Sequence, residues 1–484
     1  MPAAHDPIRF WIDTALECVR RDHTPEHSKG DSRGPFLSAR ALGMAMAAMR
    51  DAPLPKASRI LDLPNGTPDG APASPACARA AACHQVLLQR YPTQSHALNA
   101  AWDRWQGLYP ALADPTSELQ GRQVGNAVQL LGLGDRALAA RNDYVPGGPY
   151  THAEDPFEPG QGYAGSAWGQ ALPLVAQRVS DFPPPPGRIS ATVVRPDAHF
   201  ATDYEAVQRT GAAGPRGRSP DQEVTGIFWG YDGASELGTP PRLYLQIVMG
   251  VLDEVDARKP GGLAAEDVLN VVTGAALAMA DAGIEAWRYK YSAEHMMWRP
   301  VLGIAHGLAA LKAGEPGWQP LGRPDTNGSR TGVTPNFPAY PSGHATFGAS
   351  AFQVLRTFLV HKGLAELAPD GTDRVRFCAR SDEYNGRNRD PRGDKPARPV
   401  LHLQYESLWQ AIVDNSISRV YLGVHWQFDG LTVTGADPAG EFGIPASPSH
   451  LGRRGGVWLG CQIGNQVAAM IGVPSEILSA SMGR

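Results

Sequence analysis

The chain has 484 residues, of which 42% are hydrophobic and 19% charged, a balance typical of a folded protein with a large core. Its formal net charge of −4 argues against a nucleic-acid binder, which needs a basic surface. Five scattered cysteines without metal-ligand spacing are expected to be reduced structural thiols. The first residues do not form a signal peptide, and no run of 18 apolar residues is present, so we expect a cytoplasmic protein without a membrane-spanning helix.

Helical periodicity dominates the chain and alternating strand patterns are scarce, which predicts an all-α fold. The predicted helices are Pro7–Arg20, Leu37–Arg50, Ser74–Tyr91, Ser95–Leu108, Thr116–Leu131, Arg242–Ala257, Ala264–Lys290, Glu294–Leu311, His344–Lys362, Leu403–Val420, Trp426–Thr434 and Val457–Ile471. Glycine, proline or arginine enrichment predicts loops at residues 142–163, 182–188, 209–222 and 379–398.

A Pro-Ser-Gly-His turn lies inside residues 337–348 and is followed by an apolar run of small residues. Pro341 and Ser342 predict the start of a helix, with Ser342 as its cap. The backbone N–H groups of Gly343 and His344 and the positive end of the helix dipole suit an oxyanion, and His344 adds a proton donor beside it. By itself the turn is also explained as a structural helix cap.

A second motif, Ser418-Arg-Val-Tyr-Leu-Gly-Val-His-Trp-Gln-Phe-Asp429, sets Arg419 six residues before His425. Six residues correspond to about 240° of helix rotation, so the two would not share a face of one helix. Gly423 predicts a break between them. Asp429 follows His425 by one turn and could fix its tautomer. A buried structural histidine bonded to Asp429 is the alternative interpretation.

Upstream, Lys290 and Arg299 close a long helical segment. With the two motifs above they complete a set of cationic and hydrogen-bonding groups that suits a phosphate-like dianion.

The three blocks Lys-(x8)-Arg-Pro, Pro-Ser-Gly-His and Ser-Arg-(x5)-His-(x3)-Asp resemble the superfamily shared by vanadium-dependent haloperoxidases and type 2 phosphatidic acid phosphatases. Similarity to the chloroperoxidase branch extends to Leu37–Met44, Phe228–Gly233, Gly238–Arg242 and Asp281–Ile284. The resemblance implies two four-helix bundles with long Gly/Pro-rich connections and the anion site on the C-terminal one. We therefore expect a boundary near residues 190–220, between an N-terminal bundle of residues 1–205 and a C-terminal bundle of residues 206–484.

The resemblance also implies a cofactor, substrates and residue roles. Vanadate would be bound through Nε2 of His425, and its oxygens would be held by Lys290, Arg299, Ser342, Gly343 and Arg419. His344 would act as the acid–base group toward hydrogen peroxide, Lys290 would polarise the peroxide, and Asp232 would pair with Arg419 and orient His344. A halide would be oxidised to hypohalous acid, and an organic acceptor would take up its halogen. Trp287 and Phe337 would line a pocket for chloride or bromide.

One departure concerns Lys290, which stands nine residues before Arg299, whereas the resembled family has seven. Nine residues place the two on opposite sides of a regular helix. Either a π-bulge or a break in residues 291–297 absorbs the difference, or Lys290 has lost its place and Arg288 substitutes for it.

Two other functions fit the same motifs. In a soluble acid phosphatase, His425 would be the nucleophile that forms a phosphohistidine, and His344 would protonate the leaving alcohol. A vanadate- or phosphate-binding protein without activity is the third hypothesis.

Overall fold

The computed structural model describes residues 6–214, 216–309, 311–392, 396–434 and 443–484. Its α-helices in the first half are α1 (Pro7–Asp22), α2 (Pro35–Asp51), α3 (Pro75–Arg90), α4 (Ser95–Leu108), α5 (Pro115–Leu130), α6 (Asp135–Ala140), α7 (Ala198–Thr210) and α8 (Pro220–Phe228). Those in the second half are α9 (Pro240–Arg258), α10 (Ala265–Lys290), α11 (Pro300–His306), α12 (Gly343–His361), α13 (Leu408–Tyr421), α14 (Gln427–Gly430), α15 (Gly456–Met470) and α16 (Ser475–Ala480). Two antiparallel strands, β1 (Phe377–Asn385) and β2 (Val400–Tyr405), form a hairpin. The predicted all-α class is confirmed, with this hairpin as an addition.

Many helices begin with the same local chemistry. An Asp or Ser side chain accepts a first-turn backbone N–H, and a proline, which has no N–H to satisfy, follows directly. This pattern starts α1, α3, α5 and α8 with the caps Asp6, Ser74, Asp114 and Ser219. These caps explain why the predicted starts of α1, α3 and α5 lie within one residue of the observed ones.

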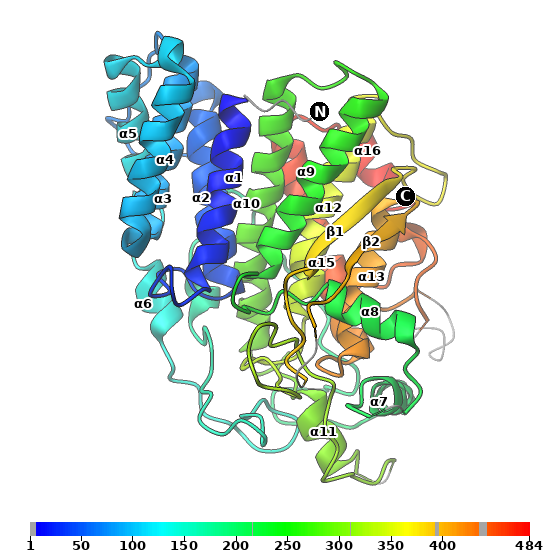
Figure 1. The fold of residues 1–484 in the computed structure, drawn as a ribbon. Helices are drawn as coiled ribbons and strands as arrows, with labels where there is room; N and C mark the ends of the chain where they lie inside the picture. The colour runs from blue at the N-terminus through cyan, green and yellow to red at the C-terminus, as the bar shows by residue number, and fades with distance from the viewer. Residues whose placement is uncertain (1–5, 215, 310, 393–395, 435–442) are drawn as a thin grey trace.

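The long helices lie side by side in one direction, with α1–α5 on one flank and α9, α12, α13 and α15 on the other (Figure 1). The 26-residue helix α10 stands between them and packs against α2 on one side and α12 on the other. It is long and apolar enough to cross a membrane, but 83% of its apolar window is buried within the protein, as in a core helix. One large apolar cluster joins both flanks, and the division at residue 205 stays a prediction.

α12 and α15 pack unusually closely because glycines of α15 face α12. A Cβ added at Gly456 would lie 2.5 Å from the carbonyl oxygen of Ser342, and one at Gly460 2.4 Å from that of Thr346. Only hydrogen atoms fit into such gaps. The first turn of α12, which carries the Ser-Gly-His motif, is therefore braced directly by the backbone of α15.

Several predicted elements were wrong. Residues 379–398 were predicted as a loop, yet they contain most of β1, and the helix predicted from Leu403 starts only at Leu408 because β2 precedes it. The helix predicted at Glu294–Leu311 is reduced to α11, because proline at position 300 favours a helix start there. Helices α6, α7, α8 and α16 were not predicted, and α8 begins inside the loop predicted at residues 209–222.

Candidate active site

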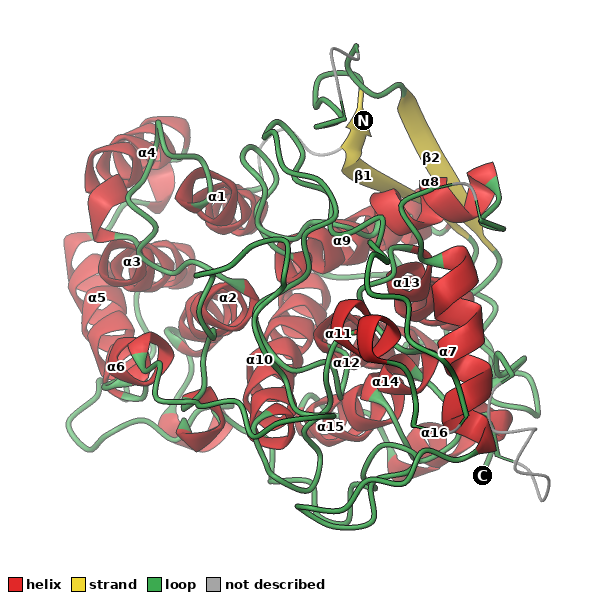
Figure 2. Ribbon diagram, turned by 90° about the horizontal axis from the view of Figure 1, so that it is seen from below, coloured by secondary structure: helices red, strands yellow, loops and turns green. Residues whose placement is uncertain are grey.

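Viewed along the helices, α11, α12, α14 and the end of α10 gather at the same face of the molecule, where loops cross over them (Figure 2). Ser342 caps α12 with its side-chain oxygen, which accepts the N–H of Ala345 at 3.4 Å. Its own N–H donates to the carbonyl oxygen of Asp429 at 2.7 Å, which ties the two motifs together. Gly343 and His344 follow in the first turn, where backbone N–H groups have no intrahelical acceptor.

His425 is held in one tautomer. Its Nδ1–H donates to Oδ2 of Asp429 at 2.9 Å, and the N–H of Trp426 donates to the same oxygen at 2.9 Å. Burial lowers the pKa of His425 well below its usual value, and the charge of Arg299 adds to this shift. The imidazole is therefore neutral, with an unprotonated Nε2 that accepts from Nη1 of Arg299 at 2.9 Å.

The predicted break between Arg419 and His425 is confirmed. Helix α13 ends at Tyr421, and Gly423 adopts a φ of +71°, which L side chains rarely take. There is no room for one either, since a Cβ at Gly423 would lie 2.3 Å from the carbonyl oxygen of Gly211. The break turns His425 toward Arg299.

Two fully buried arginines present free donors. Arg299 uses Nε and Nη1 on the carbonyl oxygens of Phe337 and Val424, but its Nη2 has no acceptor among the described residues. Nε and Nη1 of Arg419 also lack acceptors among the described residues, while its Nη2 donates to both carboxylate oxygens of Asp232. Unpaired buried donors of this kind are rare and costly. A tetrahedral oxyanion beside Nε2 of His425 fits them, because it offers charged acceptors to several N–H groups at once.

His344 and Asp232 form a second pair. Nε2 of His344 donates to the carbonyl oxygen of Gly230 at 2.8 Å and lies 3.8 Å from Oδ1 of Asp232. Burial, and then the charge of Arg419, lower the pKa of His344 to about 3. Burial alone would raise the pKa of Asp232, but Arg419 and the other nearby cationic groups outweigh it and hold that pKa below its usual value. Asp232 is thus a carboxylate and His344 a neutral base at neutral pH.

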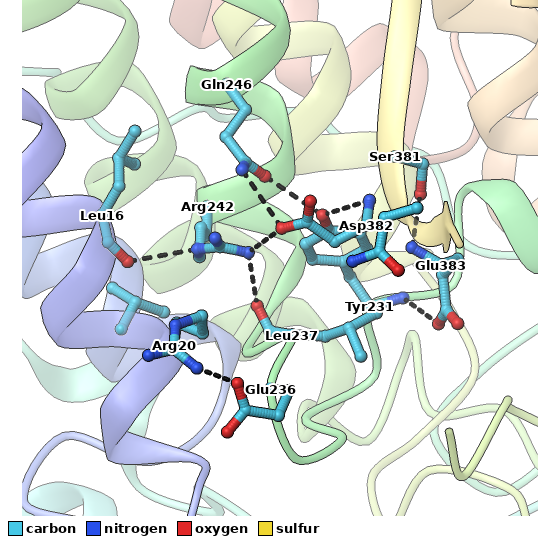
Figure 3. A network of polar contacts seen from close by, with 12 residues as sticks. Leu16, Arg20, Tyr231, Glu236, Leu237, Arg242, Gln246, Ser381, Asp382 and Glu383 are labelled. Carbon is cyan, nitrogen blue, oxygen red and sulfur yellow. Dashed lines mark hydrogen bonds and ion pairs between the residues drawn. The ribbon is translucent and has the colours of Figure 1, made fainter. Parts of the chain in front are cut away.

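The turn that carries Asp232 is fixed from outside by the network in Figure 3. Arg242 of α9 donates to the carbonyl oxygens of Leu16 and Leu237 and to Asp382 of β1 at 2.7 Å. The hydroxyl of Tyr231 accepts the N–H of Asp382 at 2.8 Å. The hairpin therefore braces the turn in a polar network that is mostly buried.

Lys290 is the last residue of α10, so a helix break, not a π-bulge, absorbs the longer spacing to Arg299. Its buried Nζ donates to the carbonyl oxygens of Pro338, Ala339 and Pro341 at 2.7, 3.1 and 2.5 Å. Burial, and then the charge of Arg299, lower the pKa of Lys290 well below its usual value. Lys290 thus lies at the site and anchors the loop before Ser342.

Arg288 is not part of the site. Its side chain is 40% exposed and pairs with Glu285 at 2.9 Å. The possibility that it substitutes for Lys290 was wrong.

A cavity of about 400 Å³ opens over these groups. His425, Gly343, His344 and Asp232 reach its surface. The rings of Phe36, Trp287, Phe337 and Phe347 line it, and the centroids of Trp287 and Phe337 are 4.8 Å apart. The two aromatic residues predicted for a halide pocket are therefore neighbours on the wall of the cavity. The exposed side chains of Arg33 and Arg330 mark its opening.

Sequence reasoning missed three residues around this site. Arg323 lines the cavity and donates to the carbonyl oxygen of Asp232 at 3.0 Å. Phe36 comes from the N-terminal flank, and its ring centroid is 4.9 Å from that of Trp287. Asp203 of α7 accepts the N–H groups of Gln427 and Phe428, both at 2.9 Å, just after His425. The position of Arg323 after Gly322 and before Pro324 in a loop was a sequence signal that could have marked it as a candidate site residue. Asp203 carries no such signal beyond its identity.

Comparison with known proteins supplies the family. Vanadium chloroperoxidase from Curvularia inaequalis is 30% identical to this chain, and the match covers 87% of the chain and 78% of the relative. The chain belongs to the vanadium haloperoxidases. The family model described as the VCPO second helical-bundle domain matches residues 270–437 of this haloperoxidase, the part that holds most of the site.

Solved structures agree with the haloperoxidase fold. A bacterial vanadium-dependent iodoperoxidase matches with a TM-score of 0.64 and 18% identity, covering 95% of each chain. The holo form of a bacterial vanadium-dependent chloroperoxidase matches with a TM-score of 0.58 and 14% identity over 90% of this chain and 92% of that one. The family model and the Curvularia relative do not favour the phosphatase alternative.

Proposed function

We propose that this haloperoxidase holds vanadate at His425 and uses hydrogen peroxide to oxidise chloride or bromide to hypohalous acid. The observation that supports it best is the set of buried, acceptor-free N–H groups of Arg299 and Arg419 around an imidazole with an unprotonated Nε2. Hydrogen bonds to charged groups contribute about 1.5–3 kcal/mol each, so several of them can retain an oxyanion. When bound, vanadate would act as a Lewis acid that activates hydrogen peroxide.

The protein's own residues would divide the remaining work. Arg299 and Arg419 donate to the oxyanion, with the Ser342 hydroxyl and the Gly343 N–H at the positive end of α12. Asp429 keeps the proton of His425 on Nδ1, so that Nε2 presents its lone pair.

Proton transfer falls to His344. Its Nε2–H is held by the carbonyl oxygen of Gly230, which leaves Nδ1 as the basic nitrogen. A neutral base beside the ionised Asp232 can take a proton from hydrogen peroxide, and the carboxylate stabilises the imidazolium that forms. Positioned groups of this kind typically contribute about 10²–10⁴-fold.

Lys290 is proposed to act chiefly through the loop that it anchors, since its Nζ already donates to three carbonyl oxygens. It would polarise peroxide only by giving up one of these bonds. Trp287 and Phe337 would exclude water from the halide, which favours chloride or bromide at a dry, apolar wall.

The test is halogenation of monochlorodimedone with chloride, bromide or iodide, with and without added orthovanadate. We expect turnover of chloride or bromide that depends on vanadate, and His344→Ala should lower it at least about 100-fold while vanadium content is kept. Hydrolysis of p-nitrophenyl phosphate that vanadate inhibits, without halogenation, would contradict the proposal.

A further inference from the structure

The cavity is larger than the proposed reaction requires. Vanadate, hydrogen peroxide and a halide together have eight heavy atoms, which at the volume of a liquid water each take about 240 Å³. The cavity measures about 400 Å³ and so falls within the range of pockets that hold organic ligands. There is room for an organic acceptor next to the reacting groups.

Two arginines on the cavity wall have no carboxylate partner among the described residues. Arg33 is exposed and forms no ion pair with any residue in the described part of the chain. Arg323 is half-buried; its Nη1 donates to the backbone oxygen of Asp232, and its Nε has no acceptor among the described residues. Its charge is thus not neutralised by a direct carboxylate contact.

The other charged groups at the cavity are already paired. Arg330 forms ion pairs with Asp325 at 3.0 Å and with Glu158. The carboxylate of Asp232 forms an ion pair with Arg419 at 2.9 Å. His23 bonds through Nδ1 to the carbonyl oxygen of Val19 and accepts the N–H of Gly34 at Nε2, so it is a neutral imidazole. Among the described residues that line the cavity, the positive charge without a carboxylate partner therefore rests on Arg33 and Arg323.

The same cavity also has an apolar, aromatic part of its wall. The rings of Phe36 and Trp287 meet at 4.9 Å, and those of Trp287 and Phe337 at 4.8 Å, on the cavity wall. An aromatic surface of this kind binds a flat apolar group through stacking and edge contacts. A ligand that suits the cavity carries an anionic group at one end and an apolar ring at the other.

We propose that the cavity binds an anionic aromatic acceptor, with its carboxylate on Arg33 and Arg323 and its ring against Phe36, Trp287 and Phe337. The inference rests on the proposed function, which supplies hypohalous acid. Halogenation then takes place inside the cavity: a ring C–H bond is replaced by C–Br, and the hydroxide of hypobromous acid leaves with the ring proton as water. Hydrogen peroxide, already consumed in forming hypobromous acid, is the oxidant.

The test compares 4-hydroxyphenylacetate with its neutral isostere 4-hydroxyphenylacetamide, at saturating bromide and peroxide. The readout is the ratio of kcat/KM for the acid to kcat/KM for the amide. It is compared with the ratio of the second-order rate constants for bromination of the two compounds by reagent hypobromous acid. We expect a higher ratio with the enzyme than with the reagent. Arg33→Gln should lower it about threefold, as for an exposed ion pair, and Arg323→Gln about tenfold, as for a charge-assisted hydrogen bond.

Matched variants separate charge from structure. Arg33→Lys and Arg323→Lys keep the charge and should keep most of the ratio. Arg330→Gln removes a paired arginine from the same opening and should leave the ratio as it is. An enzyme ratio equal to that of the reagent, or one that neither glutamine variant changes, would overturn the inference.

Binding by itself gives a readout independent of turnover. Isothermal titration of the vanadate-loaded protein without peroxide should show tighter binding of 4-hydroxyphenylacetate than of the amide, and Arg33→Gln should reduce the difference. Equal affinities would overturn the inference even if halogenation is normal. Absence of halogenation with both compounds would overturn the proposed function, and the titration would still decide about the cavity.

Discussion

The close contact of α15 with the Ser-Gly-His turn makes Gly456→Ala a sharp perturbation of the site. The added Cβ would lie 2.5 Å from the carbonyl oxygen of Ser342 and 2.6 Å from Oγ1 of Thr346. Both atoms belong to the first turn of α12, where Thr346 donates to that carbonyl oxygen. The new methyl group therefore pushes on backbone, which cannot rotate out of the way.

The required displacement can be worked out from the distances. Ordinary van der Waals contact begins at 3.4 Å, so the two helices must separate at this point by about 0.9 Å. Overpacking of this size costs about 1–3 kcal/mol of stability. A shift of about 1 Å in a catalytic group can lower turnover about 100-fold. We expect both effects for Gly456→Ala.

Gly464→Ala is the matched control. Its Cβ would lie 2.8 Å from the carbonyl oxygen of Ser350, on the same pair of helices but two turns further from the site. Thermal unfolding and bromide oxidation at saturating vanadate and peroxide are measured for both variants. We expect both to be destabilised, with turnover reduced far more in Gly456→Ala. Equal turnover in the two variants would refute the idea that α15 positions the turn.

Two further predictions concern titratable side chains at and beside the site. Lys290→Ala leaves three buried carbonyl oxygens without their donor and should reduce both the melting temperature and the retained vanadium. Arg288→Ala should change neither, because the Arg288 side chain is 40% exposed and the buried Glu285 keeps its ion pair with Arg178. Melting temperatures and vanadium analysis after gel filtration check this, and similar losses in both variants would contradict it. The pKa of His344 is lowered by burial to about 3, so between that pH and 6.5 the unfolded chain binds more protons than the folded one. Stability of the vanadate-free protein should therefore fall as the pH drops through this window, by up to about 1.4 kcal/mol per pH unit from this group. Melting temperatures at pH 5 and pH 7 check this, and their difference should be smaller in His344→Gln than in the wild type.

The site could be predicted where its chemistry is local. Ser342 at the start of a helix, Gly423 between Arg419 and His425, and Asp429 one turn after His425 all follow from capping, backbone freedom and helix spacing, and the structure has each of these features. Such rules act within a few residues, so the sequence carries them in readable form.

What could not be predicted depends on partners distant in the chain. β1 contains Arg380, Ser381, Asp382 and Glu383, a composition that favours an exposed loop. The strand forms there because Asp382 pairs with Arg242 and Glu383 pairs with Arg398, and both arginines come from other segments. Asp203 and Arg323 likewise acquire their places only through contacts with residues about a hundred or more positions away. The fate of Lys290 was open for the same reason, since its three acceptors lie in the loop before Ser342.

We infer that an oxyanion binds at Nε2 of His425, between the guanidinium groups of Arg299 and Arg419. The most direct measurement is the vanadium content of wild-type protein and His425→Ala after incubation with orthovanadate and gel filtration. We expect stoichiometric vanadium in the wild type and almost none in the variant, with both proteins folded by circular dichroism. Equal vanadium in the two proteins would contradict it.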